Sequence, residues 1–378
     1  MIYLDNAATT FQKPECVKKS VLYALDNLGS PGRGGYLPAL RAAETVYSAR
    51  EALARLFNIP TPENIVFTDN ATTAINTALK GILSPGDSFA ISGMEHNAVA
   101  RPSESLRQKG CHLYVAEGNL EGYVTKEAVK KVIFPGMRLF CLIHSSNVCG
   151  SLNNLRDIGN ELKKLGIIFM VDASQSAGCT DIDVEDAGID ILAFPGHKAL
   201  LGPQGIGGLY IREGINMSPL TEGGTGSMSE SLLQPTVLPD RFESGTLNVP
   251  AIAGLLSGVK FILHHGAENI GKAENELAKL LAEDLSEIKG LRFIGNPFSD
   301  EKTAVLSVSS DKDCIELSTL LFKNYGICTR AGLHCAPMAH RTLGTIDGGT
   351  IRFSPGIFTR KEDIKRTAYA VSECLKEM

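Results

Sequence analysis

Two ionisable residues stand directly after predicted buried strands, where parallel strands would bring them to the same edge of a sheet. Asp172 follows the apolar run 167–171, and Lys198 comes shortly after the apolar run 189–194. A buried carboxylate costs free energy unless it has a partner. The two residues could therefore form an ordinary salt bridge, or they could hold the two ends of one bound group.

Pyridoxal phosphate is the bound group that suits this pair. A carboxylate at Asp172 would keep a proton on the pyridinium nitrogen, which makes the ring an electron sink, and Lys198 would form a Schiff base with the aldehyde carbon. Either residue alone is weak evidence, and the salt bridge stays open as the alternative for the pair alone. The ordered pair favours the cofactor.

The sequence resembles the class V aminotransferase group of fold-type I pyridoxal-phosphate enzymes almost from end to end. The resemblance runs from residues 3–10, YLDNAATT, to residues 350–355, TIRFSP. Within this group the chain is most similar to the cysteine desulfurases and selenocysteine lyases. The decisive segment is 330–336, RAGLHCA, which resembles the R-x-G-x-H-C-A loop of the group II desulfurases. That loop carries their persulfide-forming cysteine, which corresponds here to Cys335.

The resemblance implies a complete catalytic site around Lys198. His96 would stack on the pyridine ring and help in proton transfer. Arg352 and Arg330 would bind the substrate carboxylate, a task for which a forked guanidinium is well suited. The other implied cofactor contacts are Asp172 at the ring nitrogen, Asn147 and Gln175 near the phenolic oxygen and the substrate carboxylate, Thr73 and His197 at the phosphate, and Thr246, which would reach the phosphate of a neighbouring subunit.

A few positions depart from the group II pattern. Pro195 stands where a phosphate-binding serine is usual, so we expect that contact to be lost or replaced. Further departures lie at Asn97, Ala331 and Leu333. All of them leave the acid, the lysine, the cysteine and the arginine of the implied site unchanged.

The implied activity is that of a cysteine desulfurase, which converts L-cysteine to L-alanine and leaves the sulfur as a persulfide on Cys335. The attacking group must be the thiolate, because a thiol is a poor nucleophile. We expect an extended loop here, on which the neighbouring His334 would point away, so we assign it no part in deprotonation. The alternatives are a selenocysteine lyase acting on L-selenocysteine, and another class V reaction such as transamination or β-elimination. A homodimer and a protein sulfur acceptor are the implied partners.

Alternating apolar runs and helical patterns between about residues 40 and 215 predict the elements that must position this site. They indicate an open α/β domain whose ligand binds at the carboxyl ends of the strands. The tail is different, with helical patterns at 268–289 and 363–376 and a strand at 303–308, which predict a smaller α+β domain. With the resemblance, this gives a fold-type I transferase: a large cofactor-binding domain of residues 15–260 with a mostly parallel sheet, and a small α+β domain of residues 1–14 and 261–378 that carries the cysteine loop.

The composition offers no sign of a nucleic-acid, membrane or metal partner. A net charge of −5 gives no electrostatic reason to expect nucleic acid or an anionic membrane. The nine cysteines include no C-x-x-C pair, which argues against disulfides, zinc and iron–sulfur clusters. The first residues do not resemble a signal peptide, and no apolar stretch is long enough to span a membrane. We therefore expect a cytoplasmic protein, in which Cys328 is a core residue of a strand rather than a resolving thiol.

Overall fold

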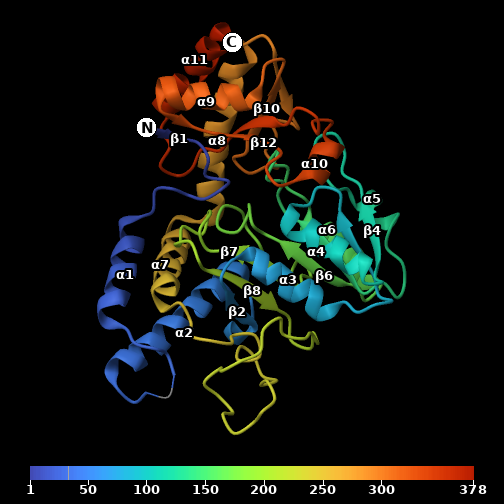
Figure 1. The fold of residues 1–378 in the computed structure, drawn as a ribbon, viewed down its shortest axis with the longest axis vertical. Helices are drawn as coiled ribbons and strands as arrows, with labels where there is room; N and C mark the ends of the chain where they lie inside the picture. Colours follow the sequence, from blue (N-terminus) through green and yellow to red (C-terminus); the bar gives the residue numbers. More distant parts are fainter. Residues whose placement is uncertain (33) are drawn as a thin grey trace.

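A mixed, mostly parallel sheet forms the centre of the larger part of the molecule (Figure 1). The structure is a computed structural model that describes residues 1–32 and 34–378. The order of the seven strands is β2-β8-β7-β6-β5-β3-β4. Their bounds are β2 Ile65–Thr68, β3 Ser88–Ser92, β4 His112–Ala116, β5 Leu139–Ile143, β6 Ile168–Asp172, β7 Ile191–Pro195 and β8 Gly207–Ile211. Neighbouring strands in the run β7-β6-β5-β3-β4 pair in parallel, and β8 runs antiparallel to both β7 and β2.

Helices cover both faces of this sheet, which explains why its strands are near-continuous apolar runs. Successive side chains of a strand point to opposite faces. Phe140 and Leu142 of β5 accordingly join one core, and Leu139 and Cys141 join the other. The first core lies under α2 (Leu37–Phe57), α5 (Lys126–Lys130), α6 (Leu155–Lys164) and α7 (Val249–His265), and the second lies under α3 (Ala71–Ile82) and α4 (Asn97–Gln108). Helix α1 (Glu15–Asn27) packs on α7.

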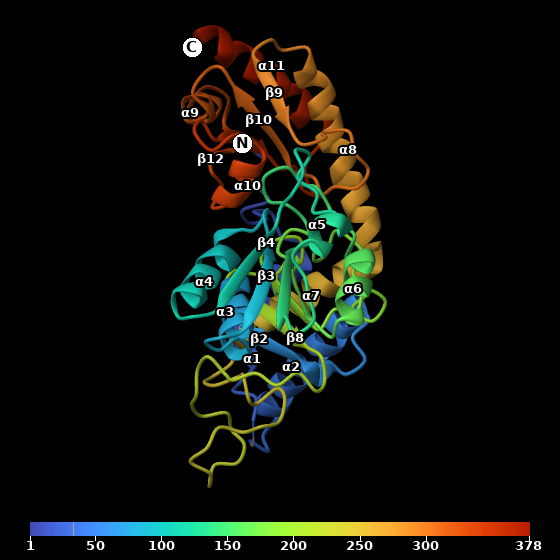
Figure 2. The same ribbon diagram turned by 90° about the vertical axis from the view of Figure 1, so that its right-hand side faces the viewer.

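A second, antiparallel sheet lies in the smaller part of the fold, with the strand order β12-β13-β10-β9. A two-stranded parallel sheet of β1 (Ile2–Tyr3) and β11 (Ile327–Cys328) accompanies it, so the first residues of the chain lie beside the last third. The remaining elements are α8 Ala267–Ser286, β9 Leu291–Ile294, β10 Leu306–Ser310, α9 Cys314–Tyr325, β12 Arg330–Gly332, α10 Pro337–Thr342, β13 Thr350–Phe353 and α11 Lys361–Glu377. Figure 2 shows α8 running from the level of α11 down towards α6.

Helix α8 connects the two parts of the fold by packing in both. Ile270 near its start belongs to the first core of the large sheet, whereas Leu281 and Leu285 near its end belong to the core of the small sheet. The strand order and the mostly parallel pairing of the large sheet confirm the predicted α/β fold. The division into residues 15–260 and the two flanking segments stays a prediction.

One predicted strand is displaced. The sequence pattern predicts a strand over 303–308, but β10 begins only at Leu306. The backbone before it is used elsewhere: Thr303 N–H donates to the carbonyl of Gly150 at 2.9 Å, and Val305 N–H donates back to the Thr303 carbonyl at 2.7 Å. A tertiary contact with the large part therefore replaces the first ladder bonds of the strand.

In the part of the chain that the structure describes, no helix combines the length and the apolar character that crossing a bilayer requires.

A buried ion pair ties α2 to the segment that precedes α7. Arg50 binds the Glu243 carboxylate and donates from Nε to the Ile65 carbonyl at 3.0 Å, while Glu243 also accepts the Phe67 N–H at 2.6 Å. Both side chains are almost fully buried. Removing one member of such a pair leaves the other charge uncompensated.

We therefore expect Arg50→Met to lower the free energy of unfolding by about 3 kcal/mol, measured by denaturant titration. Arg41→Met, at an exposed position of the same helix, is the matched control and should change it by less than about 0.5 kcal/mol. Equal stability of both variants would show that the ion pair contributes nothing.

Candidate active site

One cavity of about 560 Å³ collects most of the predicted site residues. It lies where β5, β6 and β7 end, the place at which open α/β sheets bind their ligands. Its lining includes His96, Asn147, Asp172, Gln175, His197, Lys198, Arg330, Cys335 and Arg352. Thr73 and Thr246 line a neighbouring cavity of about 260 Å³, which shares Asp69 and Gly205 with the first.

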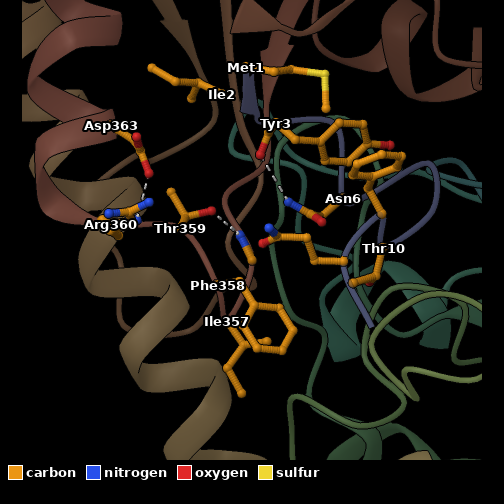
Figure 3. Close-up of a pocket in the computed structure, with 13 residues that line it drawn as sticks. Met1, Ile2, Tyr3, Asn6, Thr10, Ile357, Phe358, Thr359, Arg360 and Asp363 are labelled. Atoms are coloured by element: carbon orange, nitrogen blue, oxygen red, sulfur yellow. Dashed lines mark hydrogen bonds between the residues drawn. The ribbon is translucent and has the colours of Figure 1, made fainter. Parts of the chain in front are cut away.

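A smaller cavity of about 110 Å³ lies between the start of the chain and residues 356–363 (Figure 3). Its polar groups already bind one another: Asn6 Nδ2 donates to the Tyr3 carbonyl at 3.4 Å, and Gly356 N–H donates to Thr359 Oγ1 at 3.0 Å. The predicted catalytic residues do not line it. The larger cavity is therefore the candidate active site.

Lys198 is positioned by a tight turn after β7. Gly196 N–H donates to the Ile206 carbonyl and Leu201 N–H to the Lys198 carbonyl, at 2.8 and 2.9 Å. A side chain at Gly196 would meet the Ile206 carbonyl oxygen at 2.9 Å, so the turn requires glycine there. Burial lowers the pKa of the Lys198 amine to about 8, although the nearby Asp172 carboxylate raises it. The uncharged form of this amine, which a nucleophile or base requires, is therefore far more populated near neutral pH than in an ordinary lysine.

Asp172 is the last residue of β6 and is only 1% exposed. Its Oδ1 accepts the Ser174 N–H at 2.9 Å. Among the residues that the structure describes, the ion pairs do not include one between Asp172 and Lys198. The salt-bridge alternative is therefore not observed, and among the described residues this buried carboxylate at the cavity has no cation as an ion-pair partner.

Glu95, which no sequence pattern singled out, is a second buried acid near this carboxylate. Its Oε1 accepts the Ser92 hydroxyl at 2.6 Å and the Ile143 N–H at 2.7 Å. Burial, with a smaller contribution from the charge of Asp172, raises the pKa of Glu95 to about 8. Glu95 is therefore mostly protonated near neutral pH, so it adds no second negative charge beside Asp172.

His96 caps the N-terminus of α4. Its Nδ1 accepts the Ala98 N–H at 3.0 Å, which leaves the proton of the neutral ring on Nε2. Burial lowers the pKa of His96, and Asp172 partly offsets this effect. A neutral ring that lines the cavity is suited to stack on an aromatic ligand.

The loop that carries Cys335 is not extended, contrary to the expectation. His334 and Cys335 have φ values of +48° and +56°, in the left-handed region that costs a non-glycine residue about 1–3 kcal/mol. Tertiary bonds hold this shape: Asn97 N–H donates to the Cys335 carbonyl at 2.7 Å, and Asn147 Nδ2 donates to the His334 carbonyl at 2.8 Å. The thiol-bearing residue is exposed and lines the cavity.

His334 is buried beneath this loop, and its Nε2 lies 2.8 Å from Thr350 Oγ1. Burial lowers the pKa of His334 to about 2, and the charge of Arg352 adds to the effect. Such an imidazole is a poor base. That His334 takes no part in deprotonating Cys335 stays a prediction, and it now rests on burial and not on the direction of an extended loop.

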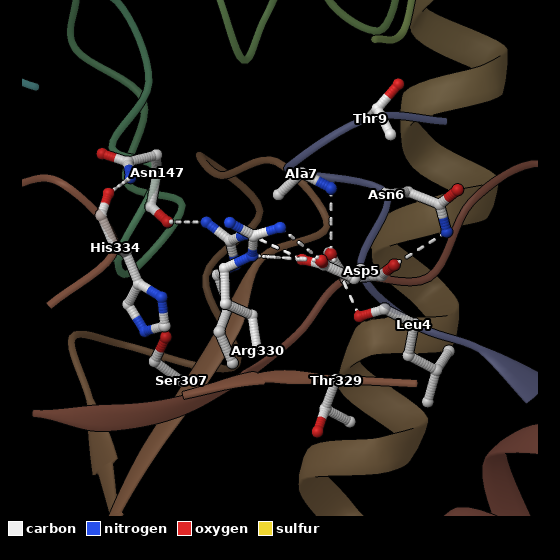
Figure 4. A network of polar contacts seen from close by, with 12 residues as sticks. Leu4, Asp5, Asn6, Ala7, Thr9, Asn147, Ser307, Thr329, Arg330 and His334 are labelled. Carbon is white, nitrogen blue, oxygen red and sulfur yellow. Dashed lines mark hydrogen bonds and ion pairs between the residues drawn. The ribbon is translucent and has the colours of Figure 1, made fainter. Parts of the chain in front are cut away.

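The two predicted carboxylate-binding arginines lie opposite each other on neighbouring antiparallel strands, Arg330 on β12 and Arg352 on β13. In this structure both bind Asp5, which sequence reasoning missed (Figure 4). Arg352 is 2% exposed, and it also donates to the Asn147 carbonyl at 3.0 Å. The only sequence signal for Asp5 was its place in the segment 3–10, which offered no role for the acid.

The phosphate end of the predicted site is formed by the start of α3. Residues 69–72 line the active-site cavity, where the first N–H groups of the helix favour an anion. The Thr73 N–H is taken by Asn70 Oδ1 at 2.9 Å. His197 Nδ1 lies 3.0 Å from Thr9 Oγ1, and burial lowers the pKa of this histidine to about 4. Thr246 is exposed.

A family model described as Aminotransferase class-V matches residues 2–367. The chain belongs to the class V aminotransferase family. A probable cysteine desulfurase of Methanothermobacter thermautotrophicus is 32% identical to it over 380 residues, covering 98% of this chain and 94% of that protein. The apo structure of a cysteine desulfurase from Thermococcus onnurineus NA1 matches with a TM-score of 0.93 at 30% identity, covering 100% of this chain and 95% of the other. The structure of an Escherichia coli cysteine desulfurase in an S-sulfonic acid form matches with a TM-score of 0.89 at 29% identity, covering 100% of this chain and 95% of the other.

These similarities confirm the predicted family, its α/β fold and the prediction that the chain is an enzyme. Class V aminotransferases use pyridoxal phosphate, and three observations on this chain fit that cofactor. Asp172 is a buried carboxylate in need of a cation, the Lys198 amine has a lowered pKa, and an anion-favouring helix start borders the same cavity. The buried Oδ1 of Asn147 also lacks a hydrogen-bond partner among the described residues.

Proposed function

We propose that this chain is a cysteine desulfurase, which takes sulfur from L-cysteine, releases L-alanine and carries the sulfur as a persulfide on Cys335. The observation that carries this proposal is the position of Cys335. Its exposed side chain lines the same cavity as Lys198 and Arg352. A transaminase or a β-lyase has no use for a thiol at that place.

Pyridoxal phosphate would be held with its ring nitrogen at Asp172, its ring against His96 and its aldehyde carbon at Lys198. When bound, the cofactor supplies an electron sink for negative charge that develops at the α carbon of the substrate. Asn147 and Gln175 would lie near the phenolic oxygen. Gln175 Nε2 is at present bound to the Ala7 carbonyl at 2.9 Å.

The phosphate would be bound by the start of α3 with Thr73, and by His197. In a homodimer, the exposed Thr246 would reach the phosphate that the neighbouring subunit holds. Pro195, the last residue of β7, lines the cavity but has neither a hydroxyl nor an N–H to donate. The N–H groups at the start of α3 would compensate for the serine that this position lacks.

The side chains of this protein then divide the work of the reaction. Arg352 and Arg330 bind the α-carboxylate of L-cysteine. The Lys198 amine takes the proton from the α carbon, and its lowered pKa favours the uncharged form that this step needs. His96, with its proton on Nε2, assists proton transfer on the face of the ring that it covers.

Sulfur transfer depends on Cys335. Its thiolate attacks the substrate sulfur, a sulfur–sulfur bond forms, and the bond between Cβ and sulfur breaks. The electron pair of the broken bond stays on Cβ, which takes up a proton and becomes the methyl group of L-alanine. In sum, L-cysteine and the Cys335 thiol give L-alanine and a Cys335 persulfide. Because this residue is exposed, a protein acceptor could take the sulfur from it, and a reducing cytoplasm would keep the thiol available.

Product analysis of the cofactor-loaded protein tests the proposal. With L-cysteine and a thiol reductant we expect L-alanine and sulfide in equal amounts, and after one turnover a persulfide on Cys335 in the mass spectrum of its peptide. Pyruvate with ammonia would indicate β-elimination, and a keto acid with amino transfer would indicate transamination; either result would refute the desulfurase. Turnover of L-selenocysteine without turnover of L-cysteine would make the protein a selenocysteine lyase instead.

A further inference from the structure

Asp5 binds both arginines of the proposed carboxylate site at once (Figure 4). Its Oδ2 accepts bonds from Arg330 Nε at 3.1 Å and Arg330 NH2 at 3.0 Å, and its Oδ1 accepts a bond from Arg352 NH2 at 2.9 Å. Two parallel N–H···O bonds fix the plane of a guanidinium as well as its position. The plane of the Arg330 guanidinium therefore depends on this carboxylate, whereas the Arg352 guanidinium is held by Asp5 together with the Asn147 carbonyl.

The backbone holds this carboxylate rigidly in place. Asp5 forms a parallel bridge with Ser354, one residue beyond β13. Ser354 N–H donates to the Leu4 carbonyl at 2.7 Å, and Ala7 N–H donates to Ser354 Oγ at 2.9 Å. Asp5 is only 8% exposed. Since the strand that carries Arg352 also carries Asp5 on its flank, the acid and the arginine keep a fixed distance.

The net charge of Asp5, Arg330 and Arg352 together suits the single α-carboxylate of an amino acid. Arg330 and Arg352 face each other across neighbouring strands, where like charges repel. Asp5 reduces their joint charge from two positive charges to one. Arg352 Nε remains without a partner among the described residues. The cluster is thus left with one net positive charge and a free donor, which suits the single α-carboxylate of an amino acid.

We propose that Asp5 is a positioning residue for substrate recognition: it orients Arg352 and Arg330 towards the α-carboxylate of the amino acid and sets their joint charge to that of one cation. This inference rests on the proposed function, because it assumes an amino-acid substrate whose carboxylate these arginines bind. Asp5 does not itself touch the reacting atoms. It acts through the two guanidiniums.

The inference predicts a loss of affinity that depends on the carboxylate of the ligand. L-Alanine and ethylamine are a matched pair, because ethylamine is alanine without its carboxylate. In the cofactor-loaded protein, Asp5→Asn should weaken L-alanine binding about tenfold, the size of a lost charged hydrogen bond. Ethylamine binding should change by less than about twofold, since it never meets the arginines. Both dissociation constants are measured from the change in visible absorbance on binding.

Kinetics provide a second measurement. Asp5→Asn should raise KM for L-cysteine about tenfold and leave kcat within about threefold, because the arginines bind the substrate and take no part in bond breaking. Asp5→Glu, which keeps the charge on a longer side chain, should give a smaller loss of L-alanine affinity that still exceeds twofold. If Asp5→Asn does not fold, the same alanine-to-ethylamine comparison with Asp5→Glu decides the question.

The variant Asn6→Ala distinguishes a purely structural role of Asp5 from its proposed positioning of the arginines. Asn6 lies on the same segment, and its side-chain hydrogen bonds within the described part of the chain go to backbone alone: it donates to the Ser354 carbonyl at 2.9 Å and to the Tyr3 carbonyl. If Asn6→Ala weakens L-alanine as much as Asp5→Asn does, Asp5 is only an anchor and the inference fails. It also fails if Asp5→Asn binds L-alanine more tightly, because Asp5 would then be a competitor of the substrate.

The titration of the site gives a readout that anchoring alone would not move. Burial is the main cause of the lowered pKa of Lys198, with Asp172 raising it, Arg352 and Arg330 lowering it and Asp5 raising it. Removing the Asp5 charge leaves the two cations uncompensated, which disfavours a proton at the Lys198 nitrogen. The pKa at which the visible absorbance of the loaded protein titrates should therefore fall by about 0.5 in Asp5→Asn and stay constant in Asn6→Ala.

An unchanged titration in Asp5→Asn would refute the charge-setting role. Failure of the wild type to make L-alanine from L-cysteine would instead refute the proposed function.

Discussion

Replacing Lys198 with alanine should remove the visible absorbance that the protein shows after incubation with pyridoxal phosphate, and should lower turnover of L-cysteine by at least about a thousandfold. The amine would be both the covalent attachment point of the cofactor and the base at the α carbon. Among the described residues, the cavity lining contains no second lysine that could take over both roles. The Lys198 side chain lines a cavity with a buried Asp172, and its lowered pKa makes it reactive near neutral pH.

Lys13 provides the matched control for this prediction. Partial burial lowers the pKa of Lys13 to about 8 as well, and its Nζ donates to the His197 carbonyl at 2.7 Å, so it is a second, half-buried lysine near the site. It does not line the active-site cavity. Lys13→Ala should therefore keep the absorbance band. If Lys198→Ala retained the band and Lys13→Ala lost it, the cofactor would be attached to Lys13, and our assignment to Lys198 would be wrong. Far-ultraviolet circular dichroism of both variants checks that they are folded.

Local sequence was sufficient to predict the parts of the site that lie at strand ends. The apolar runs before Asp172 and Lys198 form the parallel neighbours β6 and β7, and the edge that they share brings the two residues to one cavity. Such predictions succeed because the period of side chains and the burial of a parallel sheet are visible within a few residues.

Asp5 could not be found in this way. Its ion pair with Arg352 joins residues 347 positions apart, and no local pattern encodes that contact. The same holds for the loop shape at Cys335, which depends on donors from Asn97 and Asn147 in the large part of the fold. The protonated state of Glu95 also follows from burial, which a single sequence does not display. The missing information in all three cases is tertiary.

The remaining large effect is expected at Cys335. Cys335→Ala should keep the visible absorbance of the cofactor and the affinity for L-alanine, because in our proposal the Cys335 side chain binds neither the cofactor nor L-alanine. It should lower sulfide release from L-cysteine by at least about a hundredfold, since water and small thiols replace a positioned thiolate poorly. Alanine is the right substitution here: it keeps the side-chain constraint on a backbone whose φ is +56°, whereas glycine would relax the loop and change two properties at once.

Two other cysteines make this prediction specific. Cys16 is exposed and lies on α1, outside the lining of the cavity, so Cys16→Ala tests whether any exposed thiol can accept sulfur. Cys328 is half-buried on β11, where its strand pairs with β1, so Cys328→Ala tests whether it resolves the persulfide as a disulfide. Both variants should retain wild-type sulfide release. Full activity of Cys335→Ala would exclude the persulfide mechanism, whereas loss of activity in Cys328→Ala would show that a second thiol takes part. The position of Cys335 favours neither result: it is the exposed thiol that shares a cavity with the lysine and the arginines, and a sulfur atom held there can leave towards solvent.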